Sequence, residues 1–399
     1  DVGAVTGPII NNGGTDDTQP TLRGTAADSA RVEIFNGTTS LGFATVNAQG
    51  NWTFTPTTPL ANGIYNFNVV AIDAAGNRAD ASNTWTVTID NATPTAPTLT
   101  GVEDNVGTLV GQIDEGSKTD DTQPTLSGTT SPGSTVIIYD NNVEIGRVTT
   151  SDGNWSFTPT TPLGEGSHSL TLTTTNSAGN TSPASEPFEF SVDTTAPSRP
   201  ILNSVNDNQG PVTGDLLNNQ TTNDATPTLS GTAEANSTLK IYDNGNLVAT
   251  ITVPETGNWT WTPTTPLSNA SHAFTINTTD EAGNVSATTP AFTIVVDTVA
   301  PDTPSAITAT DNTPPNTGAI TEGQQTNETR PALSGTAEPN ATVQILDNGT
   351  VIGTVKADAG GSWNFTPSTA LPPGEHQLTV TATDSAGNVS PPSPALNFV

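Results

Sequence analysis

Acidic side chains recur at fixed positions along this chain of 399 residues, which has 39 Asp and Glu against 9 Lys and Arg. Calcium and other hard divalent cations prefer oxygen ligands, several of them carboxylates. Carboxylates gathered in one place also repel one another unless a cation neutralises them. We therefore expect Ca²⁺ to bind where these acids meet. The candidate ligands are Asp16, Asp17, Asp90, Asp104, Asp120, Asp121, Asp193, Asp207, Asp224, Asp280, Asp297, Asp311 and Asp384.

A longer repeat sets the spacing of these acids. Trp52, Trp155, Trp259 and Trp363 lie 103 or 104 residues apart, in the similar segments NWTFTPTTPL, NWSFTPTTPL, NWTWTPTTPL and SWNFTPSTAL. A period of this length matches a small domain with its own core. We expect four domains, the first lacking its beginning and the fourth its end. They are repeat 1 (1–91), repeat 2 (92–194), repeat 3 (195–298) and repeat 4 (299–399).

Each repeat is predicted to consist of short strands separated by turns. In repeat 2, runs such as STVIIYDN, NWSFTPT and SHSLTLTTT are rich in Thr, Val, Ile and aromatic residues, as is typical of strands. Trp155 and Phe157 stand two apart and so share the core face of one strand. With PTLTGV at 97–102 as a first strand, the count reaches about seven. The pattern predicts an all-β protein of four tandem immunoglobulin-like β-sandwich domains, arranged end to end as an extended rod.

Strand direction predicts where the acids lie within a repeat. After the first strand of repeat 2, residues 103–121 form a long acidic segment that is expected to be a loop without a clear strand. If the first strand runs from top to bottom, this loop lies at the bottom, and so does the end of the last strand at Asp193. The turn before the last strand points up, so Asp280 of repeat 3 faces the same junction from the other side.

The candidate calcium sites therefore fall at the junctions between repeats. The expected ligands at the first junction are Asp16, Asp17 and Asp90, and those at the second are Asp104, Asp120, Asp121, Asp193 and Asp280. The expected ligands at the third junction are Asp207, Asp224, Asp297 and Asp384. A further junction beyond repeat 4 would be bound by Asp311 and Glu328. The alternative is that Asp and Asn here cap turns through their own backbone, and no complete EF-hand loop is present. Asn176 replaces the upper Asp in repeat 2, so the sites are not expected to fill alike.

The motifs together resemble a known family. The segments DNVG, TDDTQPTLSGT, IYDN, GNWSFTPTTPL, AGN and VDTTAP are similar to the tandem bacterial Ig-like repeats in the extender regions of RTX-type and biofilm-associated adhesins. The similarity covers all four copies. It implies a calcium-stiffened stalk, exported by type I secretion, that holds a terminal binding domain away from the bacterial cell. It does not imply catalysis.

Composition excludes several classes of function. A net charge of −30 argues against nucleic acid, which is bound by Lys and Arg, and against anionic membrane surfaces. The chain has no Cys and hence no disulfide or thiolate site, and it has no apolar run long enough to span a membrane. We expect an extracellular monomer whose partners are its own neighbouring repeats.

The candidates for catalysis are weak. His168, His272 and His376 share one repeat position that holds Tyr65 in repeat 1, as a half-buried strand residue would. No nucleophile is paired with a His in one copy alone. The regular Trp residues are expected in the core. We therefore expect no enzyme. Two other functions stay open: a multivalent carbohydrate- or ice-binding module, and a spacer attached to a secreted hydrolase.

Overall fold

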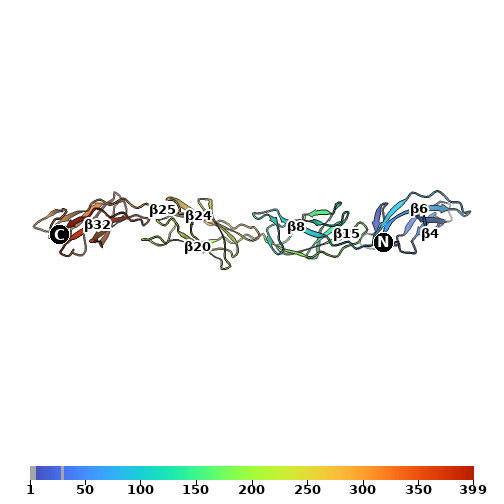
Figure 1. Ribbon diagram of the computed structural model, residues 1–399, viewed down its shortest axis with the longest axis horizontal. Helices are drawn as coiled ribbons and strands as arrows, with labels where there is room; N and C mark the ends of the chain where they lie inside the picture. Colours follow the sequence, from blue (N-terminus) through green and yellow to red (C-terminus); the bar gives the residue numbers. More distant parts are fainter. Residues whose placement is uncertain (1–5, 28–30) are drawn as a thin grey trace. The chain divides into compact units, whose positions relative to one another are not determined.

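The computed structural model describes residues 6–27 and 31–399, and these form strands and loops without a helix (Figure 1). The chain divides into two compact units. The first comprises residues 1–195 with Glu281–Asn284, and the second comprises Ala196–Asp280 with Val285–Val399. In the described part of the chain, no helix is long and apolar enough to cross a membrane.

Repeat 2 shows the complete architecture, with two sheets whose strand orders are β14-β11-β8-β9 and β10-β16-β15-β12-β13. Its strands are β8 (Thr98–Asp104), β9 (Gly111–Gln112), β10 (Lys118–Thr119), β11 (Thr125–Thr129), β12 (Thr135–Asp140), β13 (Val143–Thr149), β14 (Asn154–Phe157), β15 (Gly166–Thr175) and β16 (Phe188–Val192). Apart from the parallel pair β10–β16, the strands pair antiparallel. The prediction of an all-β, immunoglobulin-like repeat is confirmed.

Repeat 3 has the same two sheets as repeat 2. In repeat 4, an isolated parallel bridge between Gln324 and Phe398 stands in place of the strand pair β10–β16. Repeat 3 contains β17 (Ile201–Asp207), β18 (Gly214–Asp215), β19 (Gln220–Thr222), β20 (Thr228–Thr232), β21 (Thr238–Asp243), β22 (Asn246–Thr252), β23 (Asn258–Trp261), β24 (Ser271–Thr279) and β25 (Phe292–Val296). Repeat 4 contains β26 (Thr308–Asp311), β27 (Gly318–Ile320), β28 (Ala332–Thr336), β29 (Thr342–Asp347), β30 (Thr350–Lys356), β31 (Ser362–Phe365), β32 (His376–Thr383) and β33 (Leu396–Phe398).

Repeat 1 differs from the others in its smaller sheet. Its strands are β1 (Gly13–Thr15), β2 (Leu22–Thr25), β3 (Arg31–Asn36), β4 (Thr39–Thr45), β5 (Asn51–Phe54), β6 (Gly63–Ile72) and β7 (Trp85–Ile89). The larger sheet has the order β1-β7-β6-β3-β4, whereas β2 and β5 form a two-stranded sheet. Within the described residues of repeat 1, no strand takes the place of β8.

Each repeat has its own core between the two sheets, and the four regular tryptophans belong to it. Trp52, Trp155, Trp259 and Trp363 are 7%, 4%, 2% and 1% exposed. In repeat 2, Trp155 packs with Val102, Leu126 and Phe190. The prediction that these tryptophans are core residues is confirmed, and a stacking surface made of them is excluded.

The acidic segment after the first strand is not a plain loop, and this part of the prediction is wrong. In repeat 2 it contains β9, which pairs with Glu103 and Asp104 of β8, and β10, which pairs with Ser191 and Val192 of β16. These strands have two residues each, too few for an alternating pattern to show in the sequence. They join the two ends of the repeat, because β10 lies beside the last strand.

Candidate functional site

The candidate site is the junction between consecutive repeats. We define it by three parts: the end of the last strand, the acidic segment of the same repeat, and the Ala-Gly-Asn loop of the following repeat. The Ala-Gly-Asn loops comprise Asp73–Asn77, Asn176–Asn180, Asp280–Asn284 and Asp384–Asn388. Of the third loop, Glu281–Asn284 belong to the first unit and Asp280 to the second.

The inner carboxylates of the acidic segment are bonded to their own repeat. In repeat 2, Asp104 is 8% exposed and accepts hydrogen bonds from the Thr119 hydroxyl and from the amide of Val106 (3.0 Å). Asp121 is 2% exposed and accepts from the amides of Gln123 (2.7 Å) and Asn105 (3.2 Å). These bonds fasten the segment to the end of β8, and they are the turn-capping arrangement considered as the alternative to metal binding.

The same arrangement recurs in repeats 3 and 4. Asp207 accepts from the Thr222 hydroxyl at 2.5 Å, and Asp311 accepts from the Thr326 hydroxyl at 2.5 Å. Asp224 accepts from the amides of Thr226 (2.8 Å) and Asn208 (3.0 Å). Glu328 replaces this Asp in repeat 4, and the hydrogen bond from the Arg330 amide is the main cause that holds its pKa below the usual range.

Backbone hydrogen bonds reach from the acidic segments to the next Ala-Gly-Asn loops. The donors are the amides that directly follow Thr15, Thr119 and Thr222, and the acceptors are the alanine carbonyls of the loops. The pairs are Asp16 with Ala178 at 3.0 Å, Asp120 with Ala282 at 3.1 Å, and Asn223 with Ala386 at 3.0 Å. The three alanines are 3%, 1% and 3% exposed, whereas Ala75, at the equivalent position of repeat 1, is exposed.

A side-chain hydrogen bond accompanies each backbone bond. The asparagine that ends the loop donates through Nδ2 to the carbonyl of the aspartate after the last strand. The pairs are Asn180 with Asp90 at 2.7 Å, Asn284 with Asp193 at 2.7 Å, and Asn388 with Asp297 at 2.8 Å. We call the backbone and side-chain bonds together the junction clasp. It is made by backbone amides and carbonyls and by asparagine side chains, which do not titrate.

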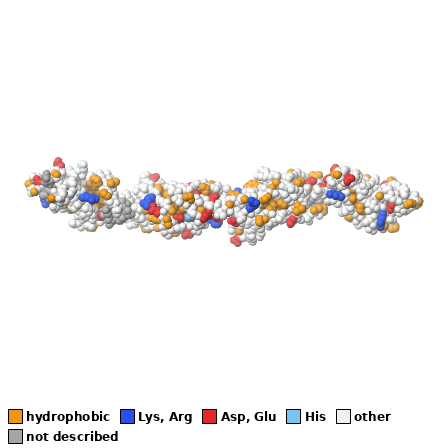
Figure 2. Space-filling view, turned by 180° about the vertical axis from the view of Figure 1, so that it is seen from behind, with side chains coloured by type: hydrophobic (Ala, Val, Ile, Leu, Met, Phe, Trp, Pro, Cys, Tyr) orange, Lys and Arg blue, Asp and Glu red, His pale blue; other side chains and the backbone are white. Residues whose placement is uncertain are grey.

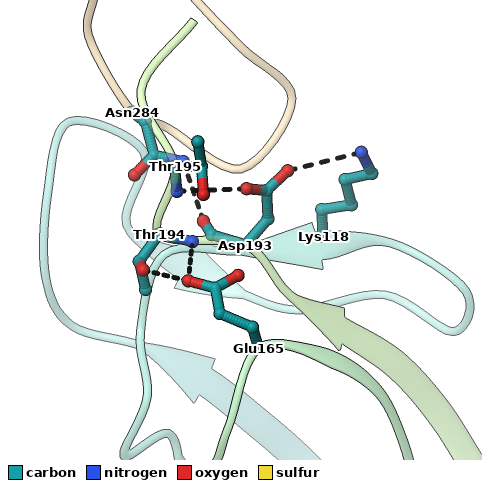
Figure 3. Close-up of polar contacts among 6 residues, drawn as sticks. All are labelled: Lys118, Glu165, Asp193, Thr194, Thr195 and Asn284. Carbon is teal, nitrogen blue, oxygen red and sulfur yellow. Dashed lines mark hydrogen bonds and ion pairs between the residues drawn. The ribbon is translucent and has the colours of Figure 1, made fainter.

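Asp193 has a positively charged neighbour (Figure 3). Its Oδ2 lies 3.5 Å from Nζ of Lys118 on β10, and its Oδ1 accepts from the Thr195 amide at 3.1 Å. Glu165 accepts from the amide and the hydroxyl of Thr194 beside it. Thr221 takes the place of Lys118 in repeat 3, and Gly14 takes it in repeat 1, as the parallel registers show.

The junction between repeats 3 and 4 contains more acidic side chains than were predicted from the sequence. The pKa of Glu338 is raised above its usual value, chiefly because this carboxylate is partly removed from water. The nearby carboxylates of Asp384, Asp297 and Asp302 raise it further. Glu338 and Asp302 are not among the residues predicted from the sequence. Glu338 lies in the loop between β28 and β29, and Asp302 in the linker before repeat 4. The neighbours of Glu338 are remote in sequence, so no local motif identifies it.

Three further predicted residues, Asp90, Asp17 and Asp384, also accept hydrogen bonds. Asp90 accepts from the Ala92 amide at 3.0 Å and from Nδ2 of Asn176 at 3.1 Å. Asp17 accepts from the Gln19 amide at 2.9 Å. Asp384 accepts from three amides of its own loop and from Nδ2 of Asn388 at 2.8 Å.

At the first and third junctions, Oδ1 of Asp16 and Oδ1 of Asn223 are buried without a hydrogen-bond partner. They occupy equivalent positions in repeats 1 and 3, so a ligand with affinity for oxygen fits both. Nevertheless, among residues 6–27 and 31–399 no three Asp, Glu or His side chains are grouped so that they could hold a metal ion. The donor chemistry therefore suits a hard cation, while the carboxylates themselves are not assembled into a coordination shell.

The histidines are structural. His168, His272 and His376 are 7%, 6% and 6% exposed. Nδ1 of each lies 2.6–2.8 Å from a carboxylate oxygen of Asp140, Asp243 or Asp347. Nε2 of each lies 2.8–3.0 Å from the backbone carbonyl four residues earlier. Both ring nitrogens of each histidine are therefore used in contacts within its own repeat.

Basic side chains are few, with 9 Lys and Arg in the whole chain. On the face shown in Figure 2, Lys and Arg side chains lie at separate places and do not form one continuous patch. A basic stripe, the usual footprint of a nucleic-acid-binding surface, is absent from this face.

Several known proteins are similar to this chain. Exoglucanase B of Cellulomonas fimi is 28% identical over 341 residues, which cover 81% of this chain and 27% of that protein. A tetra-tandem repeat from the extending region of a large adhesion protein is 22% identical, with a TM-score of 0.31 and 95% of each chain covered. A structure of a 1.5-MDa bacterial ice-binding adhesin is 20% identical, with a TM-score of 0.29, and 70% of this chain and 91% of that chain are covered.

A family model assigns all four repeats. The model described as bacterial Ig-like domain matches residues 2–91, 97–194, 201–298 and 303–399, which together make up most of the chain. Each match holds one of the β-sandwich repeats described above. The chain belongs to the bacterial Ig-like domain family and carries four of these domains in tandem.

Proposed function

We propose that this chain is a structural extender region, or stalk, of a bacterial cell-surface adhesin. In this role its repeats stand end to end outside the cell and project a distal binding domain toward a surface, a biofilm or a host. The observation that carries the proposal is the junction clasp, because the same two hydrogen bonds fasten an Ala-Gly-Asn loop to the end of a preceding repeat each time. A chain of independent domains on free linkers has no need of such contacts.

The repeats support a non-catalytic role. Every candidate catalytic group recurs in several copies, and the histidines are buried against a carboxylate and a carbonyl. Resemblance of the repeated motifs to adhesin extenders supports the adhesin assignment, as does membership of the bacterial Ig-like family.

We also propose that Ca²⁺ stiffens the junctions. Bound Ca²⁺ would neutralise carboxylates that repel one another and draw their oxygens together. The third junction fits best, since the carboxylates of Asp384, Asp297 and Asp302 act on Glu338 there and Asn223 has a buried free oxygen. At the second junction Lys118 already supplies a positive charge to Asp193, so weaker calcium binding is expected. The first junction, with Asp16 and Asp90, should lie between these two.

Small-angle X-ray scattering and calorimetry of the whole chain, in millimolar calcium and in chelator, test this proposal. We expect calcium to increase the maximum dimension and to raise the melting temperature, with magnesium much less effective because it demands stricter geometry. Glu338→Gln should weaken calcium binding, whereas Glu255→Gln, on an exposed loop of repeat 3, should not. If neither the dimension nor the melting temperature responds to calcium, the calcium role is wrong and the stalk must depend on the clasp alone.

A second candidate is a spacer region of a secreted hydrolase. The similarity to Exoglucanase B, of which the chain spans 27% of the length, favours it. The two candidates share the structural role and differ in what the repeats carry. Antibodies against this chain decide between them: surface labelling of intact cells supports the adhesin, while co-fractionation with released glucanase activity supports the spacer.

A further inference from the structure

One edge of the larger sheet in repeat 3 differs from the same edge in the other repeats. β22 is the outermost strand of that sheet, and it pairs with β21 on one side only. A strand at a sheet edge presents a row of backbone N–H and C=O groups that another strand can bind, unless its sequence prevents this. The equivalent edge strands are β4, β13 and β30 in repeats 1, 2 and 4.

Charged side chains lie on the other three edges. Glu144 and Arg147 of β13 form an ion pair on the exposed strand, and β30 ends in the exposed Lys356. β4 has no charged residue of its own, but the guanidinium of Arg31 lies over the ring of Phe43 on that strand, 4.5 Å from its centre. Charges of this kind keep edge strands from pairing with other chains. The sequence of β22, NLVATIT, contains none.

β22 also differs from its counterparts in having no glycine. Gly42, Gly146 and Gly353 stand in β4, β13 and β30 where β22 has Ala249. In those three repeats a phenylalanine ring lies in the space that a Cβ would need, and in repeat 3 Trp261 replaces that phenylalanine. Glycine weakens a strand because it has no side chain to pack. Of the four edges, β22 therefore has the residues that most favour strand pairing.

Apolar side chains are exposed along β22. Leu247 and Val248 are 54% and 42% exposed. Ala249 and Ile251 are half-buried and pack against the core of repeat 3, while Thr250 between them is exposed. The edge thus combines a row of main-chain groups with an apolar, uncharged surface, as an association site does.

We propose that β22 pairs antiparallel with β22 of a second copy of this chain, so that two larger sheets become one continuous sheet. Identical strands related by a two-fold axis present the same surface to each other. A second copy also carries the net charge of −30, so the two chains repel one another except where neither surface is charged. β22 meets this condition against itself. The pairing differs from the monomer expected from the sequence, and it depends neither on the stalk function nor on calcium.

The side-chain pattern of β22 determines the register. Opposite residues in an antiparallel pair point to the same face of the sheet, so a core-facing residue must meet another core-facing residue. A two-fold axis at Thr250 places Ala249 opposite Ile251 of the second copy, and Thr250 opposite itself. This register leaves Val248 outside the regular pairs, in agreement with the bulge that it forms against β21. A shift by one residue would set core-facing side chains against outward-facing ones.

Sedimentation velocity of the whole chain in chelator, over a series of concentrations, is the first test. One pair of short strands buries less area than a standard interface, so we expect a weak dimer that is populated at roughly 100 μM. Thr250→Lys sets two like charges directly opposite each other and should weaken dimerisation about tenfold or more. Thr354→Lys, at the equivalent position of β30, is the matched control and should not weaken it. A monomer throughout the series, or equal effects of the two substitutions, overturns the proposal.

A cysteine trap tests the register without depending on a loss of association. The chain has no Cys, so Thr250→Cys introduces a single thiol, which the two-fold axis places opposite its own copy. Cβ atoms at such positions are about 4.5–5.5 Å apart, close to the separation of about 3.5–4.5 Å in disulfides. Mild oxidation should therefore give a covalent dimer.

Thr252→Cys is the control for this trap. Its two thiols would lie four strand residues apart, roughly 14 Å, so the yield of covalent dimer should be much lower than for Thr250→Cys. Equal yields from the two variants would show that the copies do not meet in this register, and would overturn the proposal.

Discussion

Nδ2 of Asn388 donates a 2.8 Å hydrogen bond to the backbone carbonyl of Asp297, and so ties the Ala-Gly-Asn loop of repeat 4 to the end of the last strand of repeat 3. The same Nδ2 lies 2.8 Å from a carboxylate oxygen of Asp384 in its own loop. One amide therefore fixes the shape of the loop and its attachment together.

Asn388→Ala should loosen the third junction. The loss of one hydrogen bond costs about 1 kcal/mol, and the freed Asp297 carbonyl becomes open to water. Spin labels placed in repeats 3 and 4 should report a broader distance distribution by pulsed electron resonance, even in chelator. Asn77→Ala is the matched control, because Asn77 bonds to Asp73 in its own exposed loop. An unchanged distribution in the Asn388 variant would show that the clasp does not orient the repeats.

Glu338→Gln should stabilise repeat 4 in the absence of calcium. A carboxyl whose pKa is raised by folding binds protons more tightly in the folded state, so the free energy of unfolding falls as the pH rises through that pKa. Removing the charge should therefore raise the melting temperature near pH 7 and leave it unchanged near pH 4. The gain is on the order of a few tenths of a kcal/mol, because Glu338 is exposed and water screens its charge.

Scanning calorimetry in chelator at the two pH values measures this effect, with Glu255→Gln as the control. A lower melting temperature for Glu338→Gln near pH 7 would mean that the carboxylate makes a favourable contact that outweighs the repulsion.

Asp347→Asn should destabilise repeat 4 by about 1–3 kcal/mol, because it replaces the carboxylate that accepts from Nδ1 of His376 at 2.7 Å. Repeat 1 has a different pair of residues at the positions of this His and Asp. There, Tyr65 donates to the Ala61 carbonyl at 3.1 Å, and Asn36 stands where the other repeats have Asp. Adding His376→Tyr to Asp347→Asn should restore part of the lost stability. Thermal unfolding of the two variants decides this, and a double variant less stable than the single one would contradict it.

Gly231→Ala should cost more stability than Gly24→Ala. A Cβ on Gly231 would lie 2.0 Å from the backbone carbonyl of Ile201, whereas the nearest atoms to a Cβ on Gly24 all belong to the side chain of Trp52. A ring can tilt, but a carbonyl within a paired strand cannot move without breaking the sheet, so we expect about 1–3 kcal/mol for Gly231→Ala. Urea unfolding of both variants measures the difference, and equal costs would contradict this account.

Much of the fold could be predicted because its signals are local. Trp155 and Phe157 stand on one face of a strand, and Asn141 and Asn142 form the two-residue turn with φ of 48° and 65° that the sequence YDNN suggests. Both features depend on neighbouring residues alone. The short strands β9 and β10 escaped prediction, because two residues are too few to show a period.

The candidate site was predicted less completely. Strand direction placed Asp193 and the acidic segment at the same end of the repeat, in agreement with the parallel pairing of β10 and β16. Strand direction could not show that Asp104 and Asp121 accept hydrogen bonds from the Thr119 hydroxyl and from nearby amides. Nor could it show that Lys118 forms an ion pair with Asp193. These contacts depend on side-chain directions within a folded loop, which spacing does not determine. Glu338 was missed because its acidic neighbours come from other segments.

The parallel pairs beside the last strands have a mechanical consequence. β1, β10 and β19 lie parallel to β7, β16 and β25, so each of repeats 1 to 3 joins an early segment of its chain to its final strand. Tension applied to the two ends of the chain pulls the members of such a pair in opposite directions. Their hydrogen bonds are then loaded together in shear and cannot be opened one after another. Repeats 1 to 3 thus each contain a pair of strands that must slide past one another before the rest of the repeat can unfold under tension.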